Sequence, residues 1–129
     1  MNRLFGSLLV AAALVAVMGL PAAFAADPAQ VIDSSIGPVL ADPEGHTLYT
    51  FAKDTAGQSS CSGQCAENWP PYLADENAQP EGEWTLVTRE DGQKQWAFKG
   101  MPVYTFAQDQ NSGDTTGHGK NDAWKAVKP

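Results

Sequence analysis

Residues 45–54 read GHTLYTFAKD, and residues 100–109 read GMPVYTFAQD. Six of the ten positions are identical, at a constant offset of 55 residues. The same offset relates two further identical pairs, Gly37 with Gly92 and Trp69 with Trp124. A chain that repeats itself at a fixed spacing is built from repeated structural units. We therefore predict a fold made of two similar halves.

Runs of β-forming residues alternate with turn residues after residue 37. The two repeated runs carry no charge on either face, which is typical of strands covered on both sides. Only residues 62–68, which precede Pro70 and Pro71, indicate a short helix. The pattern predicts a mainly β fold with little helix: a small single domain in which two tandem β-repeats share one core, as a twisted antiparallel sheet or a small sandwich. The predicted strands are residues 38–41 and 47–51, a hairpin; 84–88, 95–98 and 101–106, a three-stranded meander; and 123–127.

Residues 1–25 have the features of a secretory signal peptide. Arg3 supplies the positive start, residues 8–20 form an apolar run of 13 residues, and Ala23-Phe24-Ala25 is a small-x-small cleavage site. The apolar run is shorter than the roughly 20 residues that span a bilayer. We expect cleavage after Ala25, a periplasmic or secreted bacterial protein, and no stable membrane span in the mature chain.

The mature chain has room for one domain. Removing 25 of the 129 residues leaves 104, too few for two ordinary domains. Its seven basic and 15 acidic residues argue against binding to nucleic acid, which needs clusters of Lys and Arg. The predicted boundaries are a flexible lead-in over residues 26–36 and a single β-domain over residues 37–129, divided into repeat one (37–71), a loop (72–83), a strand (84–91) and repeat two (92–128).

Cys61 and Cys65 are the only cysteines. In an exported protein such a pair is expected to form a disulfide that closes a local loop. The alternative is a redox-active or metal-binding pair. The two-residue spacing of redox dithiols and haem attachment motifs is absent, and no histidine follows Cys65. The residues favour a structural disulfide.

The duplicated motif supports a family resemblance. Tyr-x-Phe-x-x-Asp occurs twice, and a Cys-Ala and a Trp-Pro-Pro segment follow its first copy. With these features the chain resembles the bacterial secreted-repeat family, predicted lipoproteins with a tandem Tyr-x-(Phe/Trp/Tyr)-x-x-Asp motif and no known function. The resemblance covers about residues 37–128 and implies an envelope protein, but it supplies no catalytic residue. Many members begin with a lipidated cysteine, and this chain has none near its predicted cleavage site. The motif residues are Tyr49, Phe51, Asp54, Tyr104, Phe106 and Asp109.

Two roles are open for this motif. In the structural role, Tyr49 and Phe51 share one face of a strand and fill the core, while Asp54 accepts backbone N–H bonds in the turn that follows, as Asp109 does for residues 110–113. In the functional role, a tyrosine hydroxyl and a carboxylate bind a ligand together. The structural role accounts for both copies, and we favour it.

Metal ligands are sparse in the mature chain. His46, Met101 and His118 are weak candidates for copper, and we expect them to be surface residues. Residues 109–122 offer several oxygens but lack the glutamate of a calcium loop, so we predict a solvated turn there. The tryptophans are expected to form the core; their alternative role is a platform for sugars or a flat cofactor. They are Trp69, Trp84, Trp96 and Trp124.

No catalytic motif is present. The sequence has no Gly-x-Ser-x-Gly elbow, phosphate loop or zinc helix. We therefore predict a non-enzymatic binding or structural module with no cofactor and with an unknown envelope partner or small ligand. The alternative is a periplasmic metal or haem protein, with copper as the metal. Because the cysteines and histidines do not repeat, any site is expected in the unmatched loops, residues 61–69 of the first half and 109–122 of the second.

Overall fold

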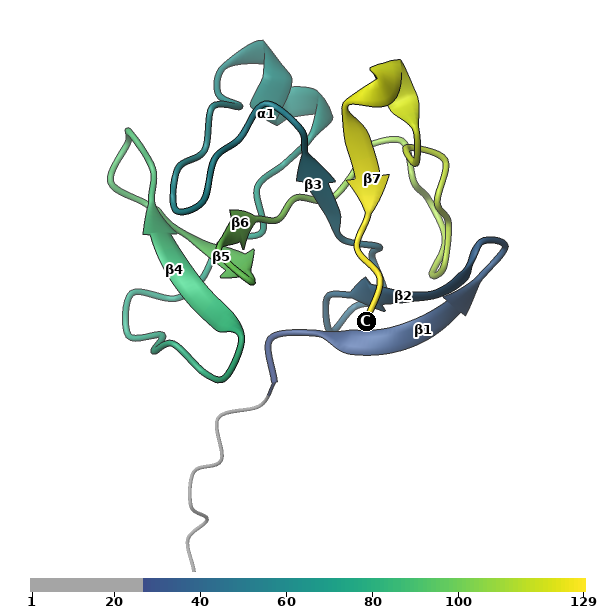
Figure 1. Ribbon diagram of the computed structural model, residues 1–129, viewed down its shortest axis with the longest axis horizontal. Helices are drawn as coiled ribbons and strands as arrows, with labels where there is room; N and C mark the ends of the chain where they lie inside the picture. Colours follow the sequence, from purple (N-terminus) through teal and green to yellow (C-terminus); the bar gives the residue numbers. More distant parts are fainter. Residues whose placement is uncertain (1–26) are drawn as a thin grey trace, which may run out of the picture.

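The computed structural model describes residues 27–129 (Figure 1). The predicted signal peptide, residues 1–25, lies outside the described residues. In chain order the elements are β1 (Gln30–Ser34), β2 (Gly37–Ala41), β3 (Tyr49–Phe51), α1 (Gln64–Asn68), β4 (Trp84–Thr88), β5 (Lys94–Phe98), β6 (Met101–Pro102), the 3-10 turn η1 (Lys120–Asp122) and β7 (Trp124–Ala126).

The strands form three small antiparallel sheets: β1 with β2, β3 with β7, and β4 with β5 and β6. Figure 1 shows β3 and β7 side by side at the centre, with the other two sheets below and to one side. The predicted mainly β fold is confirmed, including the short helix, the meander and the last strand. The strands do not make one continuous sheet. The predicted hairpin of residues 38–41 and 47–51 is reduced to a single bridge between Ala41 and Thr47, because β2 pairs with β1 and β3 pairs with β7.

Residues 26–36 were predicted to be a flexible lead-in, and this is wrong. Residues 30–34 form β1, which pairs with β2 along its full length, from Gln30 opposite Ala41 to Ser34 opposite Gly37. The sequence signal is weak because β1 is an edge strand in which Val31 and Asp33 face solvent. The β1–β2 hairpin matches β4–β5 at the repeat offset, so each repeat includes the strand before its first turn.

The two repeats meet at Tyr49 and Tyr104. Each tyrosine N–H donates to the carbonyl oxygen of the other, with N–O distances of 2.8 and 2.9 Å. On its other side Tyr49 pairs with Ala126 of β7, and Tyr104 forms the equivalent bridge to Pro71, 55 residues before Ala126. Each core strand therefore pairs with the end of the other repeat. This crossing also ends β6 at Pro102, because Tyr104 leaves the β5 edge to join Tyr49 and Pro71.

The aromatic core follows the same symmetry. The Trp69 and Trp124 rings stack with their centroids 3.9 Å apart and their planes 1° from parallel. Phe106 stacks on Trp69 at 4.1 Å, and Phe51 stacks on Trp124 at 4.2 Å. Each tryptophan thus packs on the phenylalanine of the other repeat, which extends the crossing from the backbone to the side chains.

A second apolar cluster lies between the hairpins and the chain end. The prediction that the tryptophans form the core is confirmed for Trp69, Trp84 and Trp124, while Trp96 is half-buried against this second cluster. Both clusters draw residues from the two repeats, so the halves share their interior. The buried members of the second cluster are Leu40, Leu48, Trp84, Val103 and Val127.

Candidate functional site

The tyrosines and aspartates of the two motifs bind each other across the repeats. The Tyr49 hydroxyl donates to Asp109 Oδ2 at 2.6 Å, and the Tyr104 hydroxyl donates to Asp54 Oδ2 at 2.6 Å. Both tyrosines are fully buried. The favoured prediction, that the tyrosines fill the core, agrees with this burial; neither role considered from the sequence pairs a tyrosine with the aspartate of the other motif.

These contacts favour the un-ionised phenols. Burial, followed by the hydrogen bond to Asp54, raises the pKa of Tyr104 to about 12. Burial and then Asp109 raise the pKa of Tyr49 still further above its ordinary value. A buried phenolate beside a carboxylate would bring two negative charges together in a region of low dielectric constant. Both hydroxyls therefore act as hydrogen-bond donors.

The aspartates also bind backbone N–H groups, although not in the turns predicted. Asp54 Oδ1 accepts hydrogen bonds from the N–H of Ser60 at 2.7 Å and from its hydroxyl at 2.9 Å. Asp109 Oδ1 likewise accepts bonds from the N–H and hydroxyl of Thr116. The turn after Asp109 is instead closed by Asp114, whose carboxylate accepts two backbone N–H bonds that lower its pKa. Each motif aspartate therefore binds the tyrosine of the other repeat and also a residue six or seven positions later in its own repeat.

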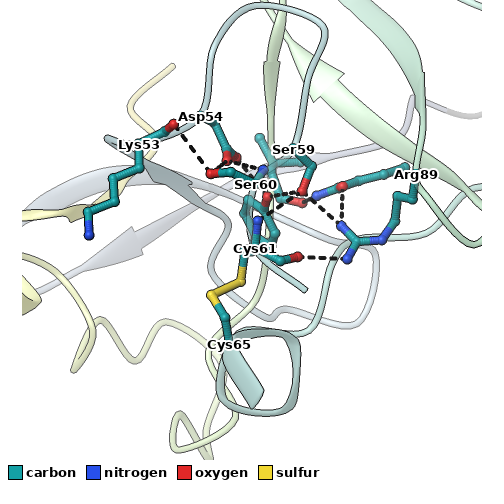
Figure 2. Close-up of a disulfide and its surroundings, with 10 residues drawn as sticks. Lys53, Asp54, Ser59, Ser60, Cys61, Cys65 and Arg89 are labelled. Carbon is teal, nitrogen blue, oxygen red and sulfur yellow. Dashed lines mark hydrogen bonds between the residues drawn. A yellow bond between two sulfur atoms is a disulfide. The ribbon is translucent and has the colours of Figure 1, made fainter. Parts of the chain in front are cut away.

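Cys61 and Cys65 form the predicted disulfide. It closes the loop that leads into α1 (Figure 2). Cys61 is fully buried in the aromatic cluster. Since Cys65 lies within α1 and Cys61 before it, no regular helix spans both residues. The disulfide holds the first of the two unmatched loops that the sequence singles out.

A chain of hydrogen bonds runs from the Tyr104–Asp54 pair to this loop (Figure 2). The Tyr104 hydroxyl contacts Ser59 Oγ at 2.6 Å, and Ser59 Oγ accepts a bond from Arg89 Nη1 at 3.0 Å. Arg89 Nη1 also donates to Gln95 Oε1 at 2.8 Å, and Nη2 donates to the Cys61 carbonyl at 2.7 Å. The guanidinium thus ties β5 and the disulfide loop to the end of β4.

A polar cavity of about 270 Å³ opens beside this network. Its lining includes three serines, Ser59, Ser60 and Ser62, the side chain of Arg89, and the acidic residues Glu90 and Asp91. Among residues 27–129, no carboxylate forms an ion pair with Arg89. A half-buried cation on the wall of a polar cavity is suited to binding a negatively charged or polar group. The lining residues are Ser59, Ser60, Cys61, Ser62, Gly63, Ala66, Arg89, Glu90 and Asp91.

A second hollow lies at the matching junction of the repeats, lined by Ser35 and residues 113–116, but it has no arginine. At the repeat offset, Ser34 takes the place of Arg89, and the Ser34 hydroxyl donates to the Gly37 carbonyl within its own turn. The Tyr49 hydroxyl accepts a weak bond from the N–H of Gly117 at 3.3 Å where Tyr104 contacts Ser59. The cavity is therefore formed by a loop of the first repeat and the β4–β5 turn of the second, and its arginine distinguishes it from the matching hollow.

The three weak metal candidates, His46, Met101 and His118, have different surroundings in the structure. His46 Nδ1 lies 3.1 Å from Asp42 Oδ2 and 3.8 Å from Glu44 Oε1. In the part of the chain described, these three residues are the one group of His, Cys, Asp or Glu side chains whose ligand atoms lie within 4.8 Å of one another. His118 Nδ1 accepts a bond from the Ala126 N–H, and Met101 lies in β6. The group of Asp42, Glu44 and His46 offers three ligand atoms, one fewer than the four of a structural zinc site.

Sequence reasoning missed the two residues that shape the cavity wall, Arg89 and Ser59. Arg89 follows a strand at the start of a turn, where a lone arginine is usually solvated. Its single sequence signal is that the other repeat has a serine at the matching position. The unmatched loop at residues 61–69, in which the sequence predicts any site, contributes residues 61–63 and 66 to the lining of the cavity.

The fold defines a small mainly β protein built from two intertwined repeats. A family model described as a secreted repeat of unknown function matches residues 30–72 and 85–128. The chain belongs to this family, and the predicted resemblance and secreted localisation agree with it. No curated protein and no solved structure matches the chain. Within residues 27–129, no helix has the length and apolar character needed to cross a membrane.

Proposed function

We propose that the protein is a non-enzymatic binding module of the bacterial cell envelope, with its binding site in the cavity between Arg89 and the disulfide loop. Its signal peptide is removed after Ala25, and it acts in the periplasm or outside the cell. The hydrogen-bond chain from Asp54 through Tyr104 and Ser59 to Arg89 carries this proposal, because it connects the cavity wall to the centre of the fold.

A fixed wall favours binding. Arg89 is held by a hydroxyl, a side-chain amide and a backbone carbonyl, so little rotamer freedom remains to be lost when a ligand binds. Gln95 is fully buried and its amide nitrogen donates to the Val103 carbonyl at 2.8 Å, which fixes the acceptor that Arg89 uses. Such support from a second layer of residues is a feature of preorganised sites.

The same network argues against catalysis by the repeated motif. The Tyr49 and Tyr104 hydroxyls are occupied as donors to carboxylates, and the Asp54 and Asp109 carboxylates each accept three hydrogen bonds from protein groups. A general base or nucleophile must reach its substrate, and these groups are buried or fully bonded. The motif maintains the fold on which the cavity is built.

Photo-crosslinking in cells tests the proposal. A photoreactive amino acid is introduced at Ser62, on the cavity wall, or at Lys125, an exposed residue of β7 that is distant in the chain, and the exported protein is illuminated. We expect a discrete adduct from Ser62 and none from Lys125. Equal labelling at both positions would contradict the proposed site. Stoichiometric metal or a haem absorbance band in the exported protein would instead support the metal-binding alternative.

A further inference from the structure

We infer that the cavity binds a small zwitterion, an amino acid or the free end of a short peptide, with its carboxylate on Arg89 and its ammonium group near Glu90 and Asp91. This inference rests on the proposed binding role and specifies its ligand class. The charges of the cavity, its hydroxyl groups and its size each contribute to the argument.

The free donors of Arg89 suit a carboxylate. The three protein hydrogen bonds use both N–H groups of Nη1 and one of Nη2. A guanidinium has five N–H donors, so the Nε–H and one Nη2–H have no acceptor among residues 27–129. Nε and Nη2 share one edge of the planar group, the edge that binds carboxylates in a bidentate manner.

The missing counter-ion adds to this argument. A half-buried charge is costly unless it is paired, and the protein partners of Arg89 are all neutral: a hydroxyl, an amide and a carbonyl. The nearest motif carboxylate, Asp54, is already bonded to Tyr104 and Ser60. A ligand carboxylate would form the ion pair that no carboxylate of residues 27–129 forms with Arg89.

The acidic side chains favour a zwitterion over a simple anion. Glu90 and Asp91 are exposed and line the same cavity as Arg89. Their charges repel a dianion such as phosphate and attract an ammonium group. A volume of about 270 Å³ lies below the usual range for drug-sized ligands, so the cavity has room for an amino acid or a chain end. The Ser60 and Ser62 positions provide polar groups for its amide or α-carbon substituents.

The inference is tested by titrating the folded, exported protein with four probes and following its backbone amide resonances. The probes are alanylalanine, its C-terminal amide, its N-acetyl form and free alanine. We expect saturable shifts at Ser62 and Gly63 with alanylalanine, and binding weaker by about tenfold or more when the carboxylate is removed as the amide, because charge-assisted bonds are lost. Acetylation is expected to weaken binding as well. Tighter binding of free alanine than of alanylalanine would indicate a free amino acid as the ligand, and the reverse order would indicate the end of a peptide.

Variants locate the binding. Glu90→Gln is expected to weaken alanylalanine binding and to leave the N-acetyl form unaffected, whereas Glu76→Gln, a matched exposed change outside this cavity, alters neither. Arg89→Lys is expected to weaken every carboxylate probe. Because Arg89 also holds the loop, Ser62→Trp provides a second variant that fills the cavity without removing the guanidinium.

Several results would overturn the inference: equal binding of alanylalanine and its amide, tighter binding of inorganic phosphate, or shifts confined to residues outside the cavity. If no zwitterion binds but the photoreactive group at Ser62 still captures an envelope component, the proposed binding function stands and the ligand class is wrong. If neither occurs, both fail.

Discussion

The Tyr49 hydroxyl donates a 2.6 Å hydrogen bond to Asp109, a residue 60 positions later that belongs to the other repeat. Tyr104 and Asp54 form the same contact in the opposite direction. The motif that the chain repeats is therefore completed only when both copies are present. Its tyrosine and aspartate fasten the two repeats to each other, and this explains why the duplication yields one domain and one shared core.

Removing either phenolic hydroxyl should destabilise the whole domain. Tyr49→Phe and Tyr104→Phe each leave a carboxylate without its donor, and we expect each to lower the free energy of unfolding by about 1–3 kcal/mol. Urea denaturation measures the change. The exposed β4 residue Thr85 provides the control, since Thr85→Ser should stay within about 0.5 kcal/mol of the parent. Phenylalanine variants as stable as the parent would show that these bonds do not hold the repeats together.

Stability should fall at alkaline pH. The pKa values of Tyr72 and Tyr104 are raised to about 12 in the folded protein, and that of Tyr49 is raised further, against an ordinary value of 10.0. Because folding favours the un-ionised phenols, their contribution is complete below pH 10 and is lost as the pH rises through about 12. Absorbance of the tyrosinate band should therefore appear together with unfolding. Three tyrosines titrating near pH 10 in a folded protein would contradict the buried pairs.

Gly117 is predicted to accept no side chain. A Cβ placed there would lie 2.5 Å from the Trp69 ring and 3.0 Å from Phe106, and neither ring is free to move within the stack. We expect Gly117→Ala to destabilise the protein by about 1–3 kcal/mol through overpacking. Calorimetric melting measures the effect. In a Trp69→Phe background, where the ring is smaller, Gly117→Ala should lower the melting temperature by less. An equal loss in both backgrounds would show that contact with Trp69 is not the cause.

The disulfide should contribute modestly. Loop entropy for a closed loop of five residues gives about 2 kcal/mol, so the double variant Cys61→Ser/Cys65→Ser should remain folded with a lower melting temperature. We also expect the free energy of ligand binding at the cavity to fall by a larger fraction than the free energy of unfolding, because Arg89 binds the Cys61 carbonyl. Reduction of the parent protein by dithiothreitol serves as the matched measurement. Complete unfolding on reduction would show that the loop is central to the core.

Much of the fold was predictable because the sequence contains the same structural unit twice. The repeat offset, the uncharged core strands and the turn glycines predict the meander, the last strand and the shared core of the two repeats. The strand at residues 30–34 was not predictable in the same way, since an edge strand with exposed Val31 and Asp33 has no strong alternation. Its assignment depends on pairing with β2, which is a tertiary contact.

The candidate site was less accessible to sequence reasoning. The tyrosine and aspartate of one motif are five residues apart, and this proximity suggests a shared location; the crossing of the repeats separates them. Arg89 lies 28 residues from Cys61 and contacts it only through folding. Arg89 and the cysteine pair differ from their counterparts in the other repeat, which are Ser34, Thr116 and Lys120. Such differences indicate residues that the repeated fold does not require.

A double-mutant cycle tests the central claim, that the motif fastens the repeats by crossing between them. Tyr49→Phe is combined with Asp109→Asn in one cycle and with Asp54→Asn in another, and free energies of unfolding are measured for every variant. We predict a coupling of about 0.5–3 kcal/mol for Tyr49 with Asp109 and near-additive effects for Tyr49 with Asp54. Coupling within one motif, and none between motifs, would contradict the account.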